Sequence, residues 1–136
     1  MGIRRDARVN ALKSLYLIDV CGISIDESVE IVTGDKKLHA ETSKFMDALV
    51  RGTVEGLGEI DCLINENSRN WTMDRMPTVD RNILRIGTYE LISMPETPVN
   101  VIINEAIEIA KEFSTEASGK FVNGILDKIK KARKTE

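Results

Sequence analysis

The sequence is poor in the residues that most often bind metals, form cross-links or carry catalysis. Its 136 residues include one histidine, two cysteines, one tryptophan, two tyrosines and three phenylalanines. Cys21 and Cys62 are too few and too far apart for a disulfide framework, and with His39 as the single histidine a zinc site is improbable. We therefore expect a mainly aliphatic core, with neither a metal nor another cofactor.

Long apolar runs are also missing from the sequence. None approaches the roughly 18 residues that span a membrane, and no signal-type apolar stretch follows the N-terminal arginines. The sequence has no glycine-rich phosphate loop, nucleophile elbow or Ser/His/Asp set. Glu105 and Glu108 are three residues apart, but such a pair on a solvated helix face is seldom an acid–base site. We expect a cytoplasmic protein that has no membrane partner and is not an enzyme.

The charge is distributed unevenly along a chain of single-domain length. Residues 1–20 hold four basic and two acidic side chains, and residues 118–136 hold six basic and two acidic ones. Because the net charge is -3, the segment between these ends carries -9. Basic ends suit a polyanion and an acidic centre suits a basic partner. An unevenly charged, solvated surface is the alternative interpretation.

Apolar residues recur at helical spacing through nearly every segment, and alternating strand patterns are scarce. The sequence predicts a compact all-α bundle of about seven helices, with neighbours joined by short loops. The fifth helix is apolar on most sides, which is typical of a central, buried helix. We expect Gly52 to interrupt the third helix. Trp71, in a loop or short turn at 68–77, is expected to cap the core, with a platform for a ligand as the alternative. The first four helices are expected at about 3–20, from the Ser24 cap to 31 or 32, at 40–51 and at 54–67. The fifth runs from 77 or 78 to Pro95, the sixth starts at Pro98, and the seventh begins near 114–118 and ends in the basic tail.

The last predicted helix has two distinct faces on a helical wheel. One side is the aliphatic core stripe, and the other carries lysines around Gly124, with Phe121 at the border. An aromatic ring edged by lysines can stack on a base while the ammonium groups meet phosphates. Alternatively, Phe121 is a peripheral core residue and Gly124 a contact point between helices. The lysines of this face are Lys120, Lys128 and Lys131.

The first predicted helix repeats this combination of cations and an aromatic ring. Arg5, Arg8 and Tyr16 share one side of the wheel, next to the apolar stripe. Arginine is suited to phosphate binding and to stacking on bases. Two such helices favour a nucleic-acid-binding surface, although the spacing does not tell whether the two faces meet.

Several segments resemble the NusB family of bacterial transcription antitermination factors, and the resemblance runs nearly end to end. It is carried by Arg4-Arg5-x-Ala7-Arg8 with Leu15-Tyr16, by Asn104-Glu105-Ala106, and by Lys120-Phe121-Val122-Asn123-Gly124-Ile125-Leu126. The resemblance implies two packed helical subdomains, at about 1–75 and 76–136. It also implies binding to boxA RNA of ribosomal operons together with NusE, a ribosomal protein, and hence a role in the transcription elongation complex.

Carried over to this sequence, the resemblance implies that six residues contact RNA and that Asp80 lies on the NusE surface. Two departures weaken parts of this expectation. Asp6 stands inside the arginine cluster, where some relatives have a basic residue, and Ser68 and Arg69 provide no aromatic ring. The six residues are Arg4, Arg5, Arg8, Tyr16, Lys120 and Phe121.

Two other functions compete with RNA binding. The first is a helical scaffold without RNA affinity, or a homodimeric interaction module, whose basic ends only confer solubility. The second is a stand-alone remnant of an RNA-modifying enzyme, because a similar helical fold occurs in some ribosomal-RNA cytosine methyltransferases. The sequence ends without room for a methyltransferase domain, which disfavours the second.

Overall fold

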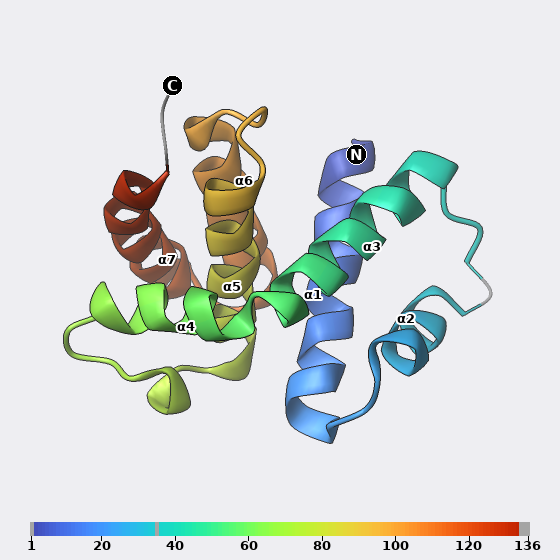
Figure 1. The fold of residues 1–136 in the computed structure, drawn as a ribbon, viewed down its shortest axis with the longest axis horizontal. Helices are drawn as coiled ribbons and strands as arrows, with labels where there is room; N and C mark the ends of the chain where they lie inside the picture. The colour runs from blue at the N-terminus through green and yellow to red at the C-terminus, as the bar shows by residue number, and fades with distance from the viewer. Residues whose placement is uncertain (1, 35, 134–136) are drawn as a thin grey trace.

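A computed structural model describes residues 2–34 and 36–133, and these fold into seven α-helices (Figure 1). No strand occurs among the described residues, so the predicted all-α fold is confirmed, whereas Lys134 and Glu136 of the predicted basic end lie outside them. No described helix is long and apolar enough to cross a membrane. The helices are α1 (Ile3–Cys21), α2 (Ile25–Thr33), α3 (Ala40–Glu55), α4 (Leu57–Glu66), α5 (Thr78–Ser93), α6 (Val99–Phe113) and α7 (Glu116–Ile129), with short 3-10 helices η1 (Met73–Arg75) and η2 (Lys130–Ala132).

Local signals determine where several helices begin and end. Gly22, at φ 68°, ends α1 in the left-handed conformation that glycine adopts without strain. The Ser24 hydroxyl caps α2 by accepting a hydrogen bond from the Glu27 backbone N–H at 3.1 Å. Thr115 caps α7 in the same way through the Ser118 N–H at 3.0 Å. Each cap satisfies a backbone donor that the first helical turn leaves without a partner.

Gly52 does not interrupt the third helix, and that prediction is wrong. Helix α3 continues through it to Glu55, and Gly56 separates α3 from α4. The reason for the glycine is tertiary: a Cβ atom at position 52 would lie 2.1 Å from Cζ of Tyr89. Gly52 therefore allows the Tyr89 ring of α5 to pack directly on the α3 backbone.

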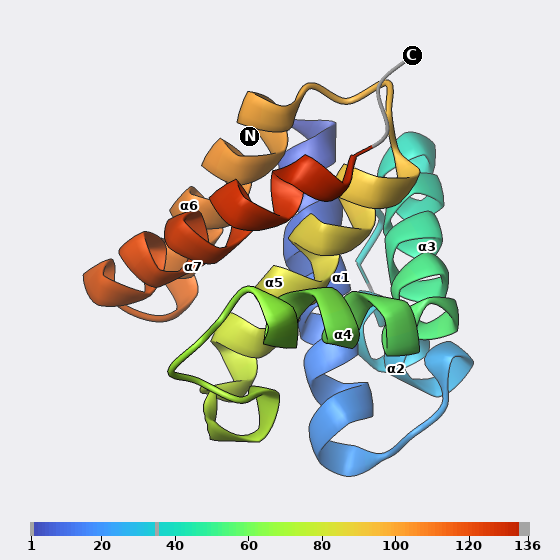
Figure 2. The ribbon, with the colours of Figure 1, turned by 60° about the vertical axis from the view of Figure 1, so that its left-hand side comes forward.

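Helix α5 is the central helix and packs against α1, α3, α4, α6 and α7. In Figure 1, α1–α3 lie on one side of the molecule and α4–α7 on the other, and Figure 2 shows α6 and α7 side by side. Gly87 lets α5 and α7 approach closely, since a Cβ there would lie 2.9 Å from a Leu126 methyl carbon. The division into subdomains near residue 75 stays a prediction.

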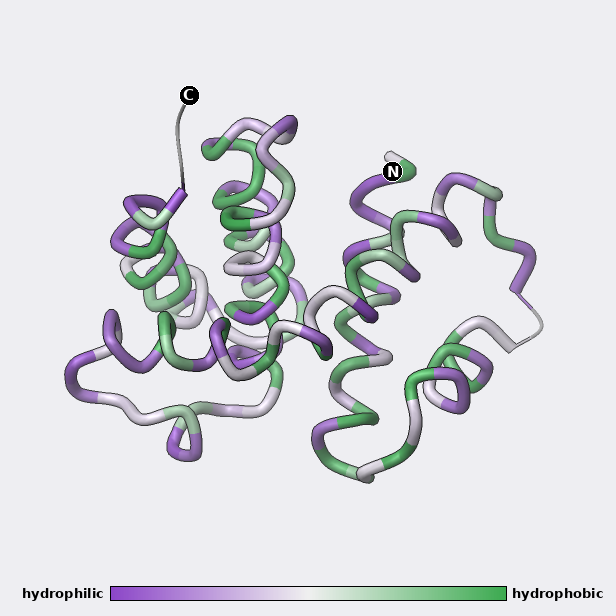
Figure 3. The backbone as a smooth tube through the Cα atoms, viewed as in Figure 1, coloured by the Kyte–Doolittle hydropathy of each residue, from purple (hydrophilic) through white to green (hydrophobic). Residues whose placement is uncertain are grey.

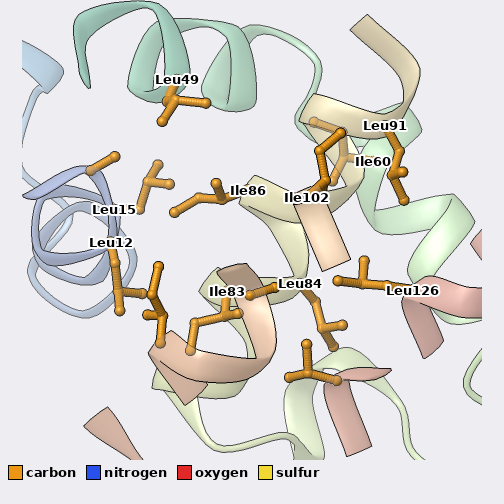
Figure 4. Close-up of a cluster of buried hydrophobic side chains, with 14 of the residues drawn as sticks. Leu12, Leu15, Leu49, Ile60, Ile83, Leu84, Ile86, Leu91, Ile102 and Leu126 are labelled. Carbon is orange, nitrogen blue, oxygen red and sulfur yellow. The ribbon is translucent and has the colours of Figure 1, made fainter. Parts of the chain in front are cut away.

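The core is aliphatic and continuous across both sides of the molecule. Hydrophobic stretches recur along every helix of the tube in Figure 3, and Leu84 and Leu91 of α5 are fully buried. Burying such a side chain stabilises the fold by about 1.5–3 kcal/mol. This confirms the prediction that the fifth helix is central. The cluster in Figure 4 includes Leu12, Leu15, Leu49, Ile60, Ile83, Leu84, Ile86, Leu91, Ile102 and Leu126.

A half-buried ion-pair network joins α1, α4 and α5 away from the core. Asp19 of α1 contacts Arg81 at 2.9 Å and Arg85 at 3.0 Å, and Arg85 also contacts Asp61 of α4 at 2.9 Å. Burial by itself would raise the pKa of Asp19, but hydrogen bonds from Asn82 and Arg81 outweigh it and lower that pKa. Asp19 therefore stays ionised and holds the C-terminal part of α1 against α5.

Arg133 closes the C-terminal end of α5. Its guanidinium donates hydrogen bonds to the backbone oxygens of Leu91 at 2.7 Å, Glu90 at 3.1 Å and Met94 at 2.9 Å. It also donates to the carbonyl of Thr97 at 2.7 Å. The last carbonyls of a helix have no partner within the helix, and a cation there is favourable against the helix dipole.

Gly52→Ala should lower the free energy of unfolding. The new methyl group must displace the Tyr89 ring, and overpacking of this kind costs about 1–3 kcal/mol. That exceeds the roughly 0.5–1 kcal/mol that alanine gains over glycine inside a helix. Gly58→Ala in α4 is the matched control, because a Cβ there has no atom within 4 Å and should only stabilise. Urea denaturation measures both, and an equal gain in both variants would contradict the packing argument.

Candidate nucleic-acid interface

The three arginines of α1 lie in three different environments. Arg8 is buried, at 4% exposure, and its guanidinium pairs with Glu90 of α5. Its Nε and Nη2 atoms donate to the two Glu90 carboxylate oxygens, both at 2.8 Å. A bidentate pair of this kind is the strongest geometry that arginine and a carboxylate form. In this conformation these donors of Arg8 point into the protein and bond to Glu90, not to solvent.

Arg5 is partly exposed and paired with Glu105 of α6. Its Nε atom donates to Glu105 Oε1 at 2.7 Å and its Nη2 atom to Oε2 at 2.6 Å. Glu105 Oε1 also accepts a longer bond of 3.4 Å from Arg8 Nη1. The hydrogen bonds from Arg5 hold the pKa of Glu105 below its ordinary value despite partial burial. The carboxylate therefore links the surface arginine to the buried Arg8–Glu90 pair.

Arg4 is the exposed member of the group. Its guanidinium carbon lies 4.0 Å from the centre of the Phe45 ring of α3, within the range of a cation–π contact. The side chain thus rests on an aromatic face while its donors remain near solvent. Of the three arginines, Arg4 is the one whose position is most compatible with phosphate binding.

Tyr16 lies further along α1, away from the arginines, and is 39% exposed. It lines an apolar groove of about 410 Å³ together with Phe113 of α6. Lys13 crosses this groove, with its Nζ atom 5.9 Å from the Phe113 ring centre. The other lining residues are Leu12, Leu17, Val32 and Val79.

Phe121 of α7 makes an aromatic pair with Trp71 of the loop before α5. The ring centres are 6.2 Å apart and the planes meet at 79°, an edge-to-face arrangement. Trp71 is 49% exposed and packs on Phe121, which lies against the core, so it covers the core only at its edge. Both rings line a pocket of about 310 Å³, and Lys120, next to Phe121, is exposed.

Gly124 lies on the same outer face of α7 and is exposed. A Cβ atom at this position would have no other atom within 4 Å. The alternative that Gly124 is a contact point between helices therefore does not hold. The glycine leaves a flat stretch of backbone between Phe121 and Lys128, both on this helix.

Asp80 of α5 lines the same pocket as Phe121 and is only 4% exposed. Its Oδ2 atom accepts a hydrogen bond of 2.8 Å from the Ser118 hydroxyl of α7. Its Oδ1 atom is buried and has no hydrogen-bond partner among the described residues. The residue expected to face NusE and the ring expected to face RNA thus share one pocket.

The structure brings together only part of the predicted set. Phe121 and Lys120 lie beside Trp71 in one site. A second site on α1 contains Arg4 and Arg5, and Tyr16 lies in a separate groove. Helix α6 lies between the first two, because it packs along α7 and pairs with Arg5 through Glu105. RNA contact by the six residues, and NusE contact by Asp80, stay predictions.

Sequence reasoning missed Glu90 and did not find the pairing of Trp71 with Phe121. A signal for Glu90 was available: it is a carboxylate in a helix that is apolar on most sides, and such a group needs a buried cation. Position 8, on the edge of the apolar stripe of the first helix, could supply one. No comparable signal marked Trp71, because its position depends on how the loop before α5 folds back toward α7.

Comparisons with known proteins give a consistent family. The NusB family model matches residues 5–131. Transcription antitermination protein NusB of Desulforapulum autotrophicum is 43% identical over 132 residues, covering 96% of this chain and 92% of that protein. The structure of T. maritima NusB is similar with a TM-score of 0.88 and 39% identity, covering 96% of this chain and 92% of that one. A crystal structure of antitermination factors NusB and NusE in complex with dsRNA is similar with a TM-score of 0.89 and 32% identity, covering 97% of this chain and 98% of that one.

Arg8→Met should lower the free energy of unfolding by about 3–5 kcal/mol, because it leaves Glu90 charged and buried without its partner. Arg8→Met combined with Glu90→Met should recover most of this loss, since no lone charge remains. Arg4→Met, on the exposed neighbour, is the control and should cost less than about 1 kcal/mol. Chemical denaturation compares the variants. A similar small loss in Arg8→Met and Arg4→Met would show that the buried pair does not stabilise the fold.

Proposed function

The chain belongs to the NusB family, and from this membership we propose that it is a transcription antitermination factor that binds boxA RNA together with NusE. The observation that carries the proposal is the match over nearly the whole chain to a NusB solved with NusE and dsRNA. The family consists of transcription antitermination proteins rather than enzymes. By extension, the chain supports transcription of ribosomal RNA operons within the cytoplasmic elongation complex.

The geometry of α7 supports RNA as the ligand. The half-exposed ring of Trp71 meets Phe121 edge to face. Beside them lie the exposed Lys120 and the open backbone at Gly124. Unpaired bases stack on such rings, and cations track the phosphate backbone. Arg4 adds an exposed cation on α1, where Phe45 holds it.

The partner protein is proposed to meet the surface next to Asp80. A ribosomal protein is basic, and the segment between the two ends of this chain carries -9. Because Asp80 is buried, its charge acts through the field in the pocket more than through direct contact. A homodimer that uses the same faces is the alternative, and the oligomeric state with and without RNA separates the two.

The direct test is a binding titration with a boxA-like single-stranded RNA, with and without NusE. The same RNA annealed to its complement is included, because the related solved complex holds dsRNA. Binding that tightens with NusE and weakens with salt supports the proposal. Absence of RNA binding under all these conditions would favour the scaffold.

Two substitutions on α7 should leave different signatures in this titration. Lys120→Gln should reduce the salt slope by about 0.7, the value for one lost phosphate contact to a single strand. Phe121→Leu should keep the slope and weaken binding by roughly 1–3 kcal/mol, the worth of one stacked base. The control is Lys37→Gln, an exposed lysine in the loop before α3, far from α7 in Figure 1. Unchanged affinity in both α7 variants would remove this face from the RNA site.

Asp80→Asn should weaken NusE binding more than it weakens binding to RNA alone, because it removes a negative charge opposite a basic protein. Asparagine can still accept the bond from Ser118, whereas a lysine there would bury an unpaired cation and unfold the region. Glu55→Gln, at the exposed end of α3, matches the change in net charge. Calorimetry with NusE and with RNA measures both affinities. An equal loss of both in Asp80→Asn would contradict the assignment to the partner surface.

A further inference from the structure

Helix α6 presents carboxylates to the arginine helix at the place where a phosphate is expected. Glu105, Glu108 and Glu112 all act on Arg5, and Glu105 bonds to it directly. Asp6, the next residue after Arg5 on α1, adds a further carboxylate to this helix. A phosphate that approaches Arg5 therefore enters a region where the protein already supplies an anion.

We propose that Glu105 sets the RNA affinity of α1 by occupying the Arg5 guanidinium as an intramolecular substitute for phosphate. This inference rests on the proposed RNA binding. The carboxylate takes the Nε–Nη2 edge with bonds of 2.7 and 2.6 Å, and that edge is the one that also fits two oxygens of a phosphate. A phosphate that takes this edge must displace Glu105.

The other two carboxylates of α6 are less suited to this role. Glu108 is exposed and directed to Lys111, with its carboxylate 3.6 Å from the ammonium group. Neither Glu108 nor Glu112 makes a hydrogen bond to Arg5 among the described residues. They contribute a long-range field that salt screens, whereas Glu105 competes for the same donors.

Removing the charge of Glu105 should leave the fold intact. The buried Arg8 keeps its two bonds of 2.8 Å to Glu90 and loses only the 3.4 Å contact. The side chains of Arg5 and Glu105 are 24% and 21% exposed, so water still reaches the guanidinium when one of its bonds is lost. Glutamine at position 105 also keeps an oxygen that can accept one bond from Arg5, so the side chain of Arg5 stays oriented.

The test is the affinity of Glu105→Gln for the boxA-like single-stranded RNA. Because no carboxylate then competes for the donors of Arg5, binding should tighten about fivefold at 0.1 M salt, which is about what one phosphate contact to a single strand is worth there. Glu108→Gln makes the same charge change one turn away and should alter affinity by less than about twofold, because it frees no donor. In an Arg5→Gln background, Glu105→Gln should have no effect.

The outcomes separate this inference from the proposed function. If the unaltered protein binds RNA and Glu105→Gln binds equally or more weakly, Glu105 does not compete with phosphate and the inference is overturned. The inference is also overturned if Glu105→Gln tightens RNA binding in the Arg5→Gln background. If neither protein binds RNA, the proposed function itself fails.

A measurement on the unaltered protein keeps the inference testable if the variant does not fold. The Nε–H resonances of Arg5 and Arg8 are followed by NMR as RNA is added. The Arg5 signal should shift as its partner changes from carboxylate to phosphate, and the Arg8 signal, held by Glu90, should stay in place. An Arg5 signal unchanged at saturation would mean that Glu105 remains bound in the complex, against the inference.

Discussion

The pairing of Glu90 with Arg8 is the interaction on which the central part of the fold depends. A buried carboxylate in the last turn of the central helix requires a countercharge, and α1 supplies it from a position 82 residues earlier. The same guanidinium lies 5.5 Å from the Phe45 ring and reaches Glu105. One side chain therefore contacts α3, α5 and α6 at once and joins α1 to all three helices.

Features that depend on neighbouring residues could be predicted from the sequence. Ser24 and Gly22 mark helix ends through bonds to residues three or four positions away. The burial of α5 follows from its apolar composition on most sides. Features that depend on a second helix were missed. From the sequence, Gly52 looks like a helix breaker, but it makes room for Tyr89 of α5. Arg8 looks like a surface cation, but it pairs with the buried Glu90.

The same distinction explains how much of the candidate site could be predicted. A helical wheel identified Phe121 at the edge of a basic face, and the outward Gly124 agrees with that face. The wheel of the first helix treated its arginines as alike, although Arg4 is exposed and Arg8 is buried, at 4% exposure. Net charge has the same weakness, because it counts Arg5 and Arg8 as free cations when each is neutralised by a carboxylate of another helix.

Arg133 has a consequence for the order in which the protein is made. The carbonyls at the end of α5 belong to residues 90–97, but the group that satisfies them is about 40 residues later in the chain. Until residue 133 has been added, the carbonyls of Leu91 and Thr97 lack this guanidinium, and the end of the central helix has only its own backbone bonds and water. Helices α1–α3 have most of their contacts among themselves, so they can assemble earlier. The segment around Arg133 therefore joins the central helix later than α1–α3 join one another.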